Sequence, residues 1–171
     1  MRKALIFLAS MIPVLMFGGY AILSLRSQYV SNPTALESAV ELATIQLFES
    51  PGDWNATPPV AGLALTEGPE NFTLIWPYVV DPVKLQNLSS MSYEDMRRSL
   101  VAAGLDVRIA FYAYNSTEGR FEIDPILTLG TPVLRESVLS RVVYVYLAGD
   151  VTINGVTLNE GFYKVVVTVT G

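Results

Sequence analysis

The chain has 171 residues, a formal net charge of −5 and a mean hydropathy of +0.39, and it contains neither cysteine nor histidine. These absences exclude disulfides, a Ser-His-Asp triad and a Cys-His pair, and they remove the usual ligands of zinc. The acidic balance argues against nucleic acid as a partner, because phosphates attract lysine and arginine.

An apolar segment near the N-terminus, residues 4–25, carries no charge and follows Arg2 and Lys3. At about 1.5 Å per residue, a helix of this length crosses a hydrocarbon core of about 30 Å. The positive-inside rule places the basic N-terminus in the cytoplasm. We therefore expect residues 1–31 to form a signal anchor or pilin-like hydrophobic helix in membrane lipid. Residues 32–171 are expected to form one extracytoplasmic domain.

Three fates of the apolar segment remain open. It can stay as an anchor, or a secretory peptidase can cut after Ala21, which forms a small-x-small pair with Gly19. In the third, a prepilin-type peptidase cuts after Ala4 and leaves the apolar helix on the mature protein. The apolar run continues through residues 22–25, which argues against the secretory cut, whereas Arg2-Lys3-Ala4 suits the prepilin-type cut.

Capping signals predict three helices after the apolar segment. Asn32-Pro33 supplies an N-cap and a first helical residue, and apolar residues at helical spacing follow until Ser50-Pro51-Gly52. Asp81-Pro82 opens a short helix in the same way. Ser92 caps another short helix, which Gly104 is expected to end.

Alternating and β-branched stretches predict strands, most of them late in the chain. Pro77 limits its stretch to an edge strand or an extended loop, and Asn154-Gly155 is a type I′ hairpin signal. The predicted strands are residues 60–65, 73–80, 107–113, 121–127, 142–148, 151–153, 156–158 and 162–170. We expect an α+β fold: an N-terminal transmembrane or pilin-type helix, then short helices, then an antiparallel β-sheet.

Two segments, Glu49-Ser50-Pro51-Gly52-Asp53-Trp54 and Gly62-Leu63-Ala64, follow the first helices and resemble archaeal type IV pilin-like proteins. Further similar stretches are residues 81–85, 88–94, 141–145 and 161–165. The resemblance implies an archaeal surface protein with a β-rich head, whose partners are other pilin-like subunits that pack through N-terminal helices. Pilins commonly carry glutamate at the fifth mature position. A cut after Ala4 places Ala9 there, which favours a minor or orphan relative.

Four Asn-x-Ser/Thr sequons follow the apolar segment, at Asn55, Asn71, Asn87 and Asn115. They are candidate N-glycosylation sites, and their position agrees with an extracellular domain. Asparagine, serine and threonine are also common in turns, so a coincidental origin stays open.

Aromatic residues offer two candidate recognition surfaces. Trp54 and Trp76 lie in proline-containing stretches, where each can form a platform for a sugar or a partner, or can plug the core beneath a loop. Four tyrosines on two predicted strands favour cross-strand packing or an interface: Tyr112, Tyr114, Tyr144 and Tyr146.

The acidic residues support no catalytic assignment. Glu94-Asp95 could serve as hydrolase acids, but they also suit the first turn of a helix, where they favour the helix dipole. A calcium site at Glu118, Glu122 and Asp124 lacks the Asp-x-Asp-x-Asp-Gly loop, so a solvated acidic edge is the simpler interpretation. Arg97-Arg98 suits a helix surface. We expect no metal and no cofactor.

These observations favour a non-enzymatic, membrane-anchored surface protein, a minor or orphan pilin-like component of a filament or adhesion structure. It would be single-pass with an extracellular C-terminal domain, or lie in an extracellular filament. One alternative is a tethered ligand- or carbohydrate-binding module. The other is a carboxylate-based hydrolase, which needs two acids roughly 5–10 Å apart in a cleft.

Overall fold

The structure is a computed structural model that describes residues 33–68, 73–102, 104–130 and 137–171. The predicted anchor, residues 4–25, and the cleavage alternatives after Ala4 and Ala21 lie outside the described residues. Within the described ranges, no helix combines the length and the apolar composition that crossing a bilayer requires.

Three helices form where capping signals predict them: α2 (Pro33–Phe48), α3 (Pro82–Ser90) and α4 (Tyr93–Leu100). The Asp81 carboxylate caps α3 by accepting the backbone N–H of Val83 at 2.9 Å. Ser92 Oγ caps α4 by accepting the backbone N–H of Asp95 at 3.2 Å. The predicted end of this helix at Gly104 is wrong, because the backbone is already extended at the C-cap, Val101.

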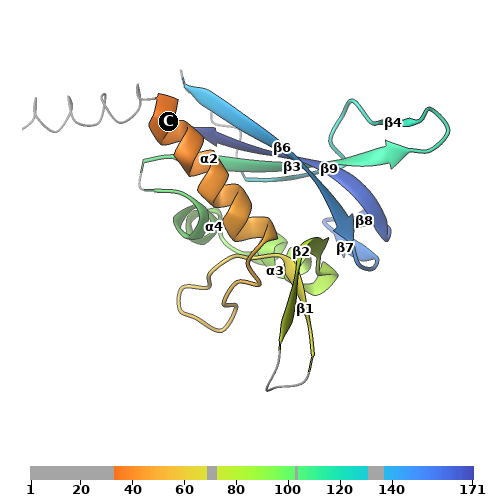
Figure 1. Cartoon of the computed structure of the whole chain (residues 1–171), viewed down its shortest axis with the longest axis horizontal. Coiled ribbons are helices and arrows are strands. Elements are labelled where there is room, and N and C mark those ends of the chain that lie inside the picture. The colour runs from red at the N-terminus through yellow and green to blue at the C-terminus, as the bar shows by residue number, and fades with distance from the viewer. Residues whose placement is uncertain (1–32, 69–72, 103, 131–136) are drawn as a thin grey trace, which may run out of the picture. The chain divides into compact units, whose positions relative to one another are not determined.

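The described residues also form nine strands, and six of them are arranged in the order β1-β2-β6-β9-β3-β4, with β5 beside β3. Figure 1 labels them. Their bounds are β1 Ala64–Glu67, β2 Leu74–Val80, β3 Asp106–Asn115, β4 Arg120–Phe121, β5 Leu127–Leu129, β6 Val138–Leu147, β7 Val151–Ile153, β8 Val156–Leu158 and β9 Gly161–Thr170. β9 lies between β6 and β3 in the sheet. As predicted, Asn154-Gly155 forms the turn of the β7–β8 hairpin, with φ of 51° and 81°.

The expected fold class is wrong in two respects. The sheet is mixed rather than antiparallel, because β2 runs parallel to β6, pairing Val79 with Tyr146 and Val80 with Leu147. The strands also do not simply follow the helices, since β1 and β2 precede α3. A tight turn would force neighbouring strands to be antiparallel. The chain between β2 and β6 instead contains α3, α4 and three strands, so β6 can run in either direction relative to β2.

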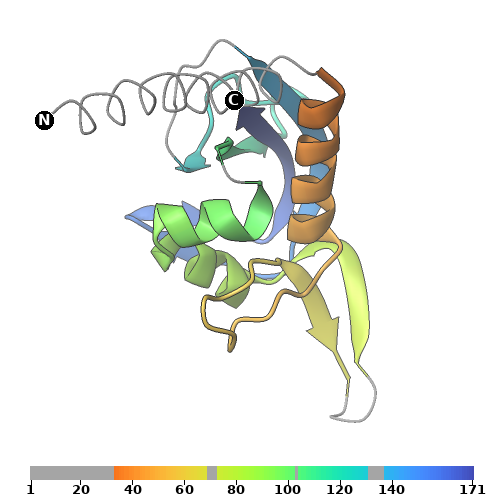
Figure 2. The same ribbon diagram turned by 90° about the vertical axis from the view of Figure 1, so that its left-hand side faces the viewer.

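The core lies between one face of the sheet and the helices. Most apolar side chains at odd positions of β3, β6 and β9 are buried together with apolar residues of α2, α3 and α4. Glu41 of α2 forms an ion pair of 3.2 Å with Arg141 of β6, which places α2 on this face. Figure 2 shows α2 beside β6, and α4 nearer the middle of the sheet. The alternating pattern predicted for residues 107–113 is therefore confirmed for Val107, Ile109 and Phe111.

The β1–β2 hairpin projects away from the other elements in Figures 1 and 2. Its pairing register shifts between Ala64 and Leu65, opposite a bulge that contains Pro77 and Tyr78, whose φ is 61°. A bulge tolerates proline, because a ladder hydrogen bond is not required there. The segment is thus a true strand, and it pairs with β6 only beyond the bulge, at Val79 and Val80.

Candidate functional site

The sheet face opposite the helices carries a group of partly exposed rings. Successive side chains of a strand point to opposite faces, so even-numbered residues of β3, β6 and β9 lie on the side away from the buried core. We define the aromatic face by the rings of Tyr112, Tyr114, Phe121, Tyr144, Tyr146 and Phe162. The register places Tyr146 opposite Phe162, and Tyr144 opposite Lys164.

Ring contacts hold the aromatic face together. Tyr114 and Phe121 pack edge to face with centroids 5.2 Å apart, as do Tyr146 and Phe162 at 5.1 Å. Phe121 of β4 also packs against Tyr144 of β6 at 5.4 Å, although β9 and β3 lie between them in the sheet. Neighbouring strands are about 4.8 Å apart, so a flat sheet would hold β4 and β6 three strand spacings apart. The β3–β4 hairpin must therefore bend over the aromatic face to bring Phe121 against Tyr144.

Lys164 lies at the centre of the aromatic face as a half-buried cation. Its Nζ is 4.2 Å from the centroid of the Tyr112 ring and 5.9 Å from that of Phe121. These are distances at which ring faces attract a cation. Throughout the described part of the chain, Lys164 forms no ion pair with a carboxylate. The ammonium group is thus held by rings, and it remains available to a negatively charged or carbonyl group of a partner.

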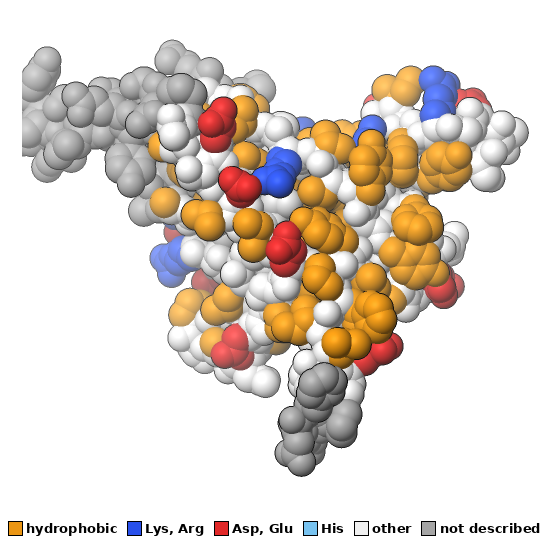
Figure 3. Space-filling model, in the orientation of Figure 1, with side chains coloured by type: hydrophobic (Ala, Val, Ile, Leu, Met, Phe, Trp, Pro, Cys, Tyr) orange, Lys and Arg blue, Asp and Glu red, His pale blue; other side chains and the backbone are white. Residues whose placement is uncertain are grey.

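Much of the aromatic face is open to solvent. Tyr144 is 60% exposed and Phe162 66%, and Val142, two residues before Tyr144 on β6, is 52% exposed. Figure 3 shows hydrophobic side chains gathered over β6 and continuing toward the β1–β2 hairpin. Tyr114 and Phe162 also flank a depression of about 340 Å³. A large contiguous apolar surface of this kind marks a binding site more often than a passive surface.

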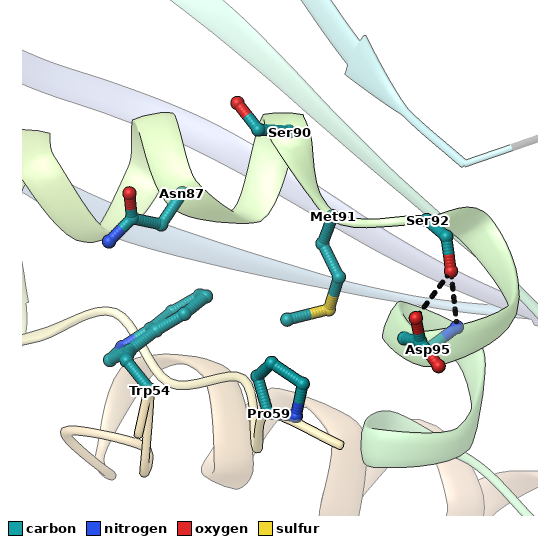
Figure 4. A pocket seen from close by; sticks show the side chains of 7 residues that line it. All are labelled: Trp54, Pro59, Asn87, Ser90, Met91, Ser92 and Asp95. Atoms are coloured by element: carbon teal, nitrogen blue, oxygen red, sulfur yellow. Dashed lines mark hydrogen bonds between the residues drawn. The ribbon is translucent and has the colours of Figure 1, made fainter. Parts of the chain in front are cut away.

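A second candidate site is an open pocket of about 390 Å³, which we call the Trp54 pocket. One side is the loop from Asp53 to Val60, and the other is the end of α3 and the start of α4. Figure 4 shows Asn87 of α3 and Met91, which directly follows α3, extending toward Trp54 and Pro59 of the loop. Its lining residues are Trp54, Pro59, Asn87, Ser90, Met91, Ser92 and Asp95.

Trp54 is half-buried, so it both packs on the core and lines the pocket. Its indole Nε1 donates hydrogen bonds to the carbonyl oxygens of Pro51 and Gly62, at 3.2 and 3.1 Å. The ring is therefore held in one orientation. Of the two interpretations of Trp54 from sequence, packing on the core is confirmed, and a role as a platform stays a hypothesis.

Trp76 lies elsewhere, on β2, where it is 43% exposed. It is not among the residues that line the Trp54 pocket. A cleft lined by both tryptophans would support the ligand-binding alternative, but Trp76 lines neither the Trp54 pocket nor the depression beside Phe162.

The acidic pair of α4 is occupied by contacts within the helix. Glu94 forms ion pairs with Arg97 at 2.7 Å and Arg98 at 3.3 Å, and the hydrogen bond from Arg97 is the main reason that its pKa is lowered. Asp95 Oδ2 accepts a hydrogen bond from the Ser92 hydroxyl at 2.6 Å. This is the arrangement that helix capping and the helix dipole favour.

The acidic residues near the β3–β4 turn do not converge. Glu118 pairs with Arg120 at 2.6 Å, and Glu122 accepts a hydrogen bond from the Asn115 side chain at 2.9 Å. The described residues contain no group of three acidic side chains placed to hold a metal ion. The alternative of a calcium site at Glu118, Glu122 and Asp124 is thus not formed there.

The sequons differ in the availability of their side chains, and Asn71 lies outside the described residues. Asn55 and Asn87 are exposed. The Asn115 side chain instead closes the β3–β4 turn: its Oδ1 accepts the backbone N–H groups of Thr117 at 3.0 Å and Glu118 at 3.1 Å. Of the described sequons, Asn55 and Asn87 present the more accessible amides to a glycosylating enzyme.

Sequence reasoning named Trp54 and the four tyrosines but missed their companions. Phe121, Phe162 and Lys164 were not assigned to the tyrosine group, and Pro59 and Met91 were not linked to Trp54. The available signal was the composition of the strands, since residues 142–146 and 162–166 are apolar or aromatic at nearly every position. This pattern fits a strand whose second face is also covered. Comparison of the chain with protein-family models, curated proteins and solved structures found no match.

Proposed function

We propose that this chain is a non-enzymatic surface protein that acts by association. Residues 4–25 hold it in the membrane, with the C-terminal domain outside the cell, and the aromatic face binds another protein subunit. The observation that carries the proposal is the exposure of the aromatic face, with Tyr144 and Phe162 each more than half exposed.

The chemistry of the aromatic face suits a protein partner. Tyrosine and phenylalanine are enriched in the cores of protein–protein interfaces, where charged residues are depleted. Lys164 is a cation held by the Tyr112 and Phe121 rings, and polar groups lie at the edge of the aromatic face. Tyr146 donates a hydrogen bond to Glu160, and Ser140 and Thr168 share a hydrogen bond of 2.8 Å. Aromatic rings around a single central cation, with polar groups at the edge, are compatible with an interface that is mostly apolar.

The proposed location rests on the sequence. Arg2 and Lys3 precede the apolar segment, and nine of the eleven basic residues and all sixteen acidic residues follow it. Of these basic residues, Arg2 and Lys3 lie directly before the segment and only Arg26 lies close behind it, which favours an N-terminus inside. In the proposed role, as a component of a surface filament or adhesion structure, the N-terminal segment provides a second contact with neighbouring subunits.

Charges placed on the aromatic face are expected to abolish the association. Tyr144→Arg combined with Phe162→Arg should reduce cross-linking between subunits in intact membranes by at least tenfold, because arginine side chains would be buried against rings without a partner. Cross-linked species are measured by immunoblotting of the full chain with a C-terminal tag. Both positions are exposed, so the fold should be retained, which circular dichroism checks.

Val83→Arg is the matched control for this experiment. Val83 is 63% exposed but lies on α3, away from the aromatic face. It should leave cross-linking unchanged. Equal cross-linking of the double variant and the wild-type chain would refute association through this face.

The membrane location is tested on intact cells with the same tagged chain. We expect the protein to remain in the membrane pellet after alkaline carbonate extraction, and protease added outside the cells to remove the tag. Leu15→Arg, which places a charge inside the apolar segment, should shift the chain into the soluble or degraded fraction. A wild-type chain that is soluble and protected from protease would contradict the proposal.

A further inference from the structure

We propose that the Trp54 pocket binds one neutral sugar ring, with Trp54 as its stacking platform. This site lies on the Asp53–Val60 loop and the α3–α4 junction, so it is separate from the aromatic face and goes beyond the proposed function. No feature of the proposed association requires it.

The platform is built before any ligand arrives. Asp53 and Val60 pair through two backbone hydrogen bonds of 2.9 Å that close the loop, and the Asp53 carboxylate accepts the backbone N–H groups of Asn55 and Ala56 at 3.2 Å. The two hydrogen bonds of the Trp54 indole then orient its ring. A rigid aromatic surface binds at a low cost in conformational entropy. The ring face that is turned away from the core is available for stacking.

The remaining lining matches the two kinds of surface on a sugar. A pyranose ring has faces of C–H groups, which pack on an indole, and an edge of hydroxyl groups that need hydrogen-bond partners. Pro59 and Met91 extend the apolar floor beside Trp54, and Asn87, Ser92 and Asp95 contribute polar atoms around it. The volume of about 390 Å³ lies in the range of small-ligand sites, and a few polar groups on an apolar surface are typical of them.

The polar groups that would contact hydroxyls are only partly engaged. Asp95 uses Oδ2 to accept the Ser92 hydroxyl, and its Oδ1 accepts no hydrogen bond from any described residue. The Asn87 side chain is exposed and, within the same described ranges, forms no hydrogen bond. A carboxylate and an amide together can accept from and donate to neighbouring hydroxyls.

The charge of the pocket narrows the class of ligand. Its lining contains no lysine or arginine and one carboxylate, so phosphate or carboxylate ligands would be repelled. One aromatic ring does not form the cage that recognises quaternary ammonium groups. A purely apolar ligand would leave Asn87 and Asp95 without partners, which costs binding energy. A neutral polyhydroxylated ring satisfies both surfaces.

The sugar can come from two sources. Asn87 is the acceptor of a sequon and lines the pocket itself, so a glycan attached to it could place its first ring on Trp54. In that attachment the Asn87 amide nitrogen forms a bond to the anomeric carbon of a lipid-linked phosphosugar donor. The anomeric carbon–oxygen bond to phosphate breaks, the lipid phosphate leaves and the amide loses one proton. The other source is a free or cell-surface saccharide.

The first arm of the test measures the shielding of Trp54 by an attached glycan. The full chain carries Trp76→Phe, so that Trp54 is the only fluorophore of its kind, and Asn55→Gln, so that no glycan adjoins it in sequence. It is produced in a host that glycosylates Asn-x-Ser/Thr and is kept in a detergent without a sugar headgroup. Mass spectrometry reports occupancy of Asn87. If the glycan covers the pocket, adding Asn87→Gln should increase acrylamide quenching of Trp54 at least twofold.

The second arm measures binding of free sugars to the unglycosylated chain carrying the same Trp76→Phe and Asn55→Gln changes. Methyl glycosides of glucose, galactose, mannose and N-acetylglucosamine are titrated, with sorbitol as an open-chain polyol control. At least one glycoside should give a saturable change in Trp54 fluorescence with Kd on the order of millimolar. Asp95→Asn should weaken it at least threefold while keeping the Ser92 cap. Sorbitol should give no saturable change.

The outcomes separate the sources and can overturn the proposal. If Asn87 carries a glycan and the Asn87→Gln variant shows increased quenching of Trp54, the sugar in the pocket is the attached glycan. If a glycoside binds saturably to the unglycosylated chain, the ligand of the pocket is a free saccharide. The proposal is overturned if no glycoside gives a saturable response and Asn87 is either unoccupied or occupied without shielding Trp54.

Discussion

Replacing Phe111 with alanine is expected to lower the free energy of unfolding by about 3–5 kcal/mol. Phe111 is 1% exposed and lies in the middle of β3, between Val165 of β9 and Leu127 of β5. Removing the ring opens a cavity between the sheet and the helices that backbone movement cannot close, because β3 is paired on both sides. The measurement is urea unfolding of the full chain in detergent, followed by tryptophan fluorescence.

Phe162→Ala provides the matched control, since it makes the same chemical change on the adjacent strand at a position that is 66% exposed. It should cost about 1 kcal/mol or less, through the lost contact with Tyr146. If both variants lost equal stability, the assignment of Phe111 to the buried face of the sheet and of Phe162 to the exposed face would be wrong. The pair therefore tests the assignment of the aromatic face as well as the core.

Gly62→Ala is expected to destabilise the chain by about 3 kcal/mol or more, since added core atoms that cannot be accommodated typically cost 1–3 kcal/mol and occasionally more. A Cβ at Gly62 would lie 2.2 Å from the backbone nitrogen of Gly52 and 2.6 Å from the carbonyl oxygen of Ser50. Both obstacles are backbone atoms, so no side-chain rotation relieves the clash. The Gly62 carbonyl also accepts the Trp54 indole N–H at 3.1 Å, so Trp54 should move as well.

The variant is measured by the same unfolding titration and by the emission maximum of Trp54 in a Trp76→Phe background, which should shift to longer wavelength. Gly155→Ala serves as the control, because a Cβ there meets no atom within 4 Å, although its φ of 81° is strained for alanine. It should cost about 1 kcal/mol. A Gly62→Ala chain as stable as this control would show that the loop packs differently against Gly62.

Short-range sequence signals predicted the capped helices and the hairpin turn well, because each is stabilised by contacts within a few residues of the chain. The Asp81 and Ser92 caps bond to backbone groups two or three residues away, and Asn154-Gly155 adopts the positive φ values that a type I′ turn requires. The error at Gly104 has the same origin. A glycine can follow a helix end at several distances, and the backbone of Val101 had already become extended.

The direction of β2 relative to β6 had no such local cause. Their pairing is confined to Val79–Val80 and Tyr146–Leu147, and it depends on where the intervening helices and strands carry the chain. The prediction that Pro77 limits its stretch to an edge strand or an extended loop was wrong, because β2 lies between β1 and β6 and a bulge absorbs the proline. The antiparallel expectation failed because it extended hairpin rules to strands that no hairpin connects.

Composition and short-range pattern alone determined the charge-free segment, the capped helices, the hairpin turn and the chemistries that a chain without cysteine or histidine excludes. Tertiary structure decided the rest. It brought Phe121 onto Tyr144 across two strands, enclosed Lys164 among rings and placed Asn87 of α3 beside Trp54 of a distant loop. The physical reason is that a cap or a turn is stabilised within a few residues, whereas a surface is formed by contacts between segments whose separation in the chain carries no information about their distance in space.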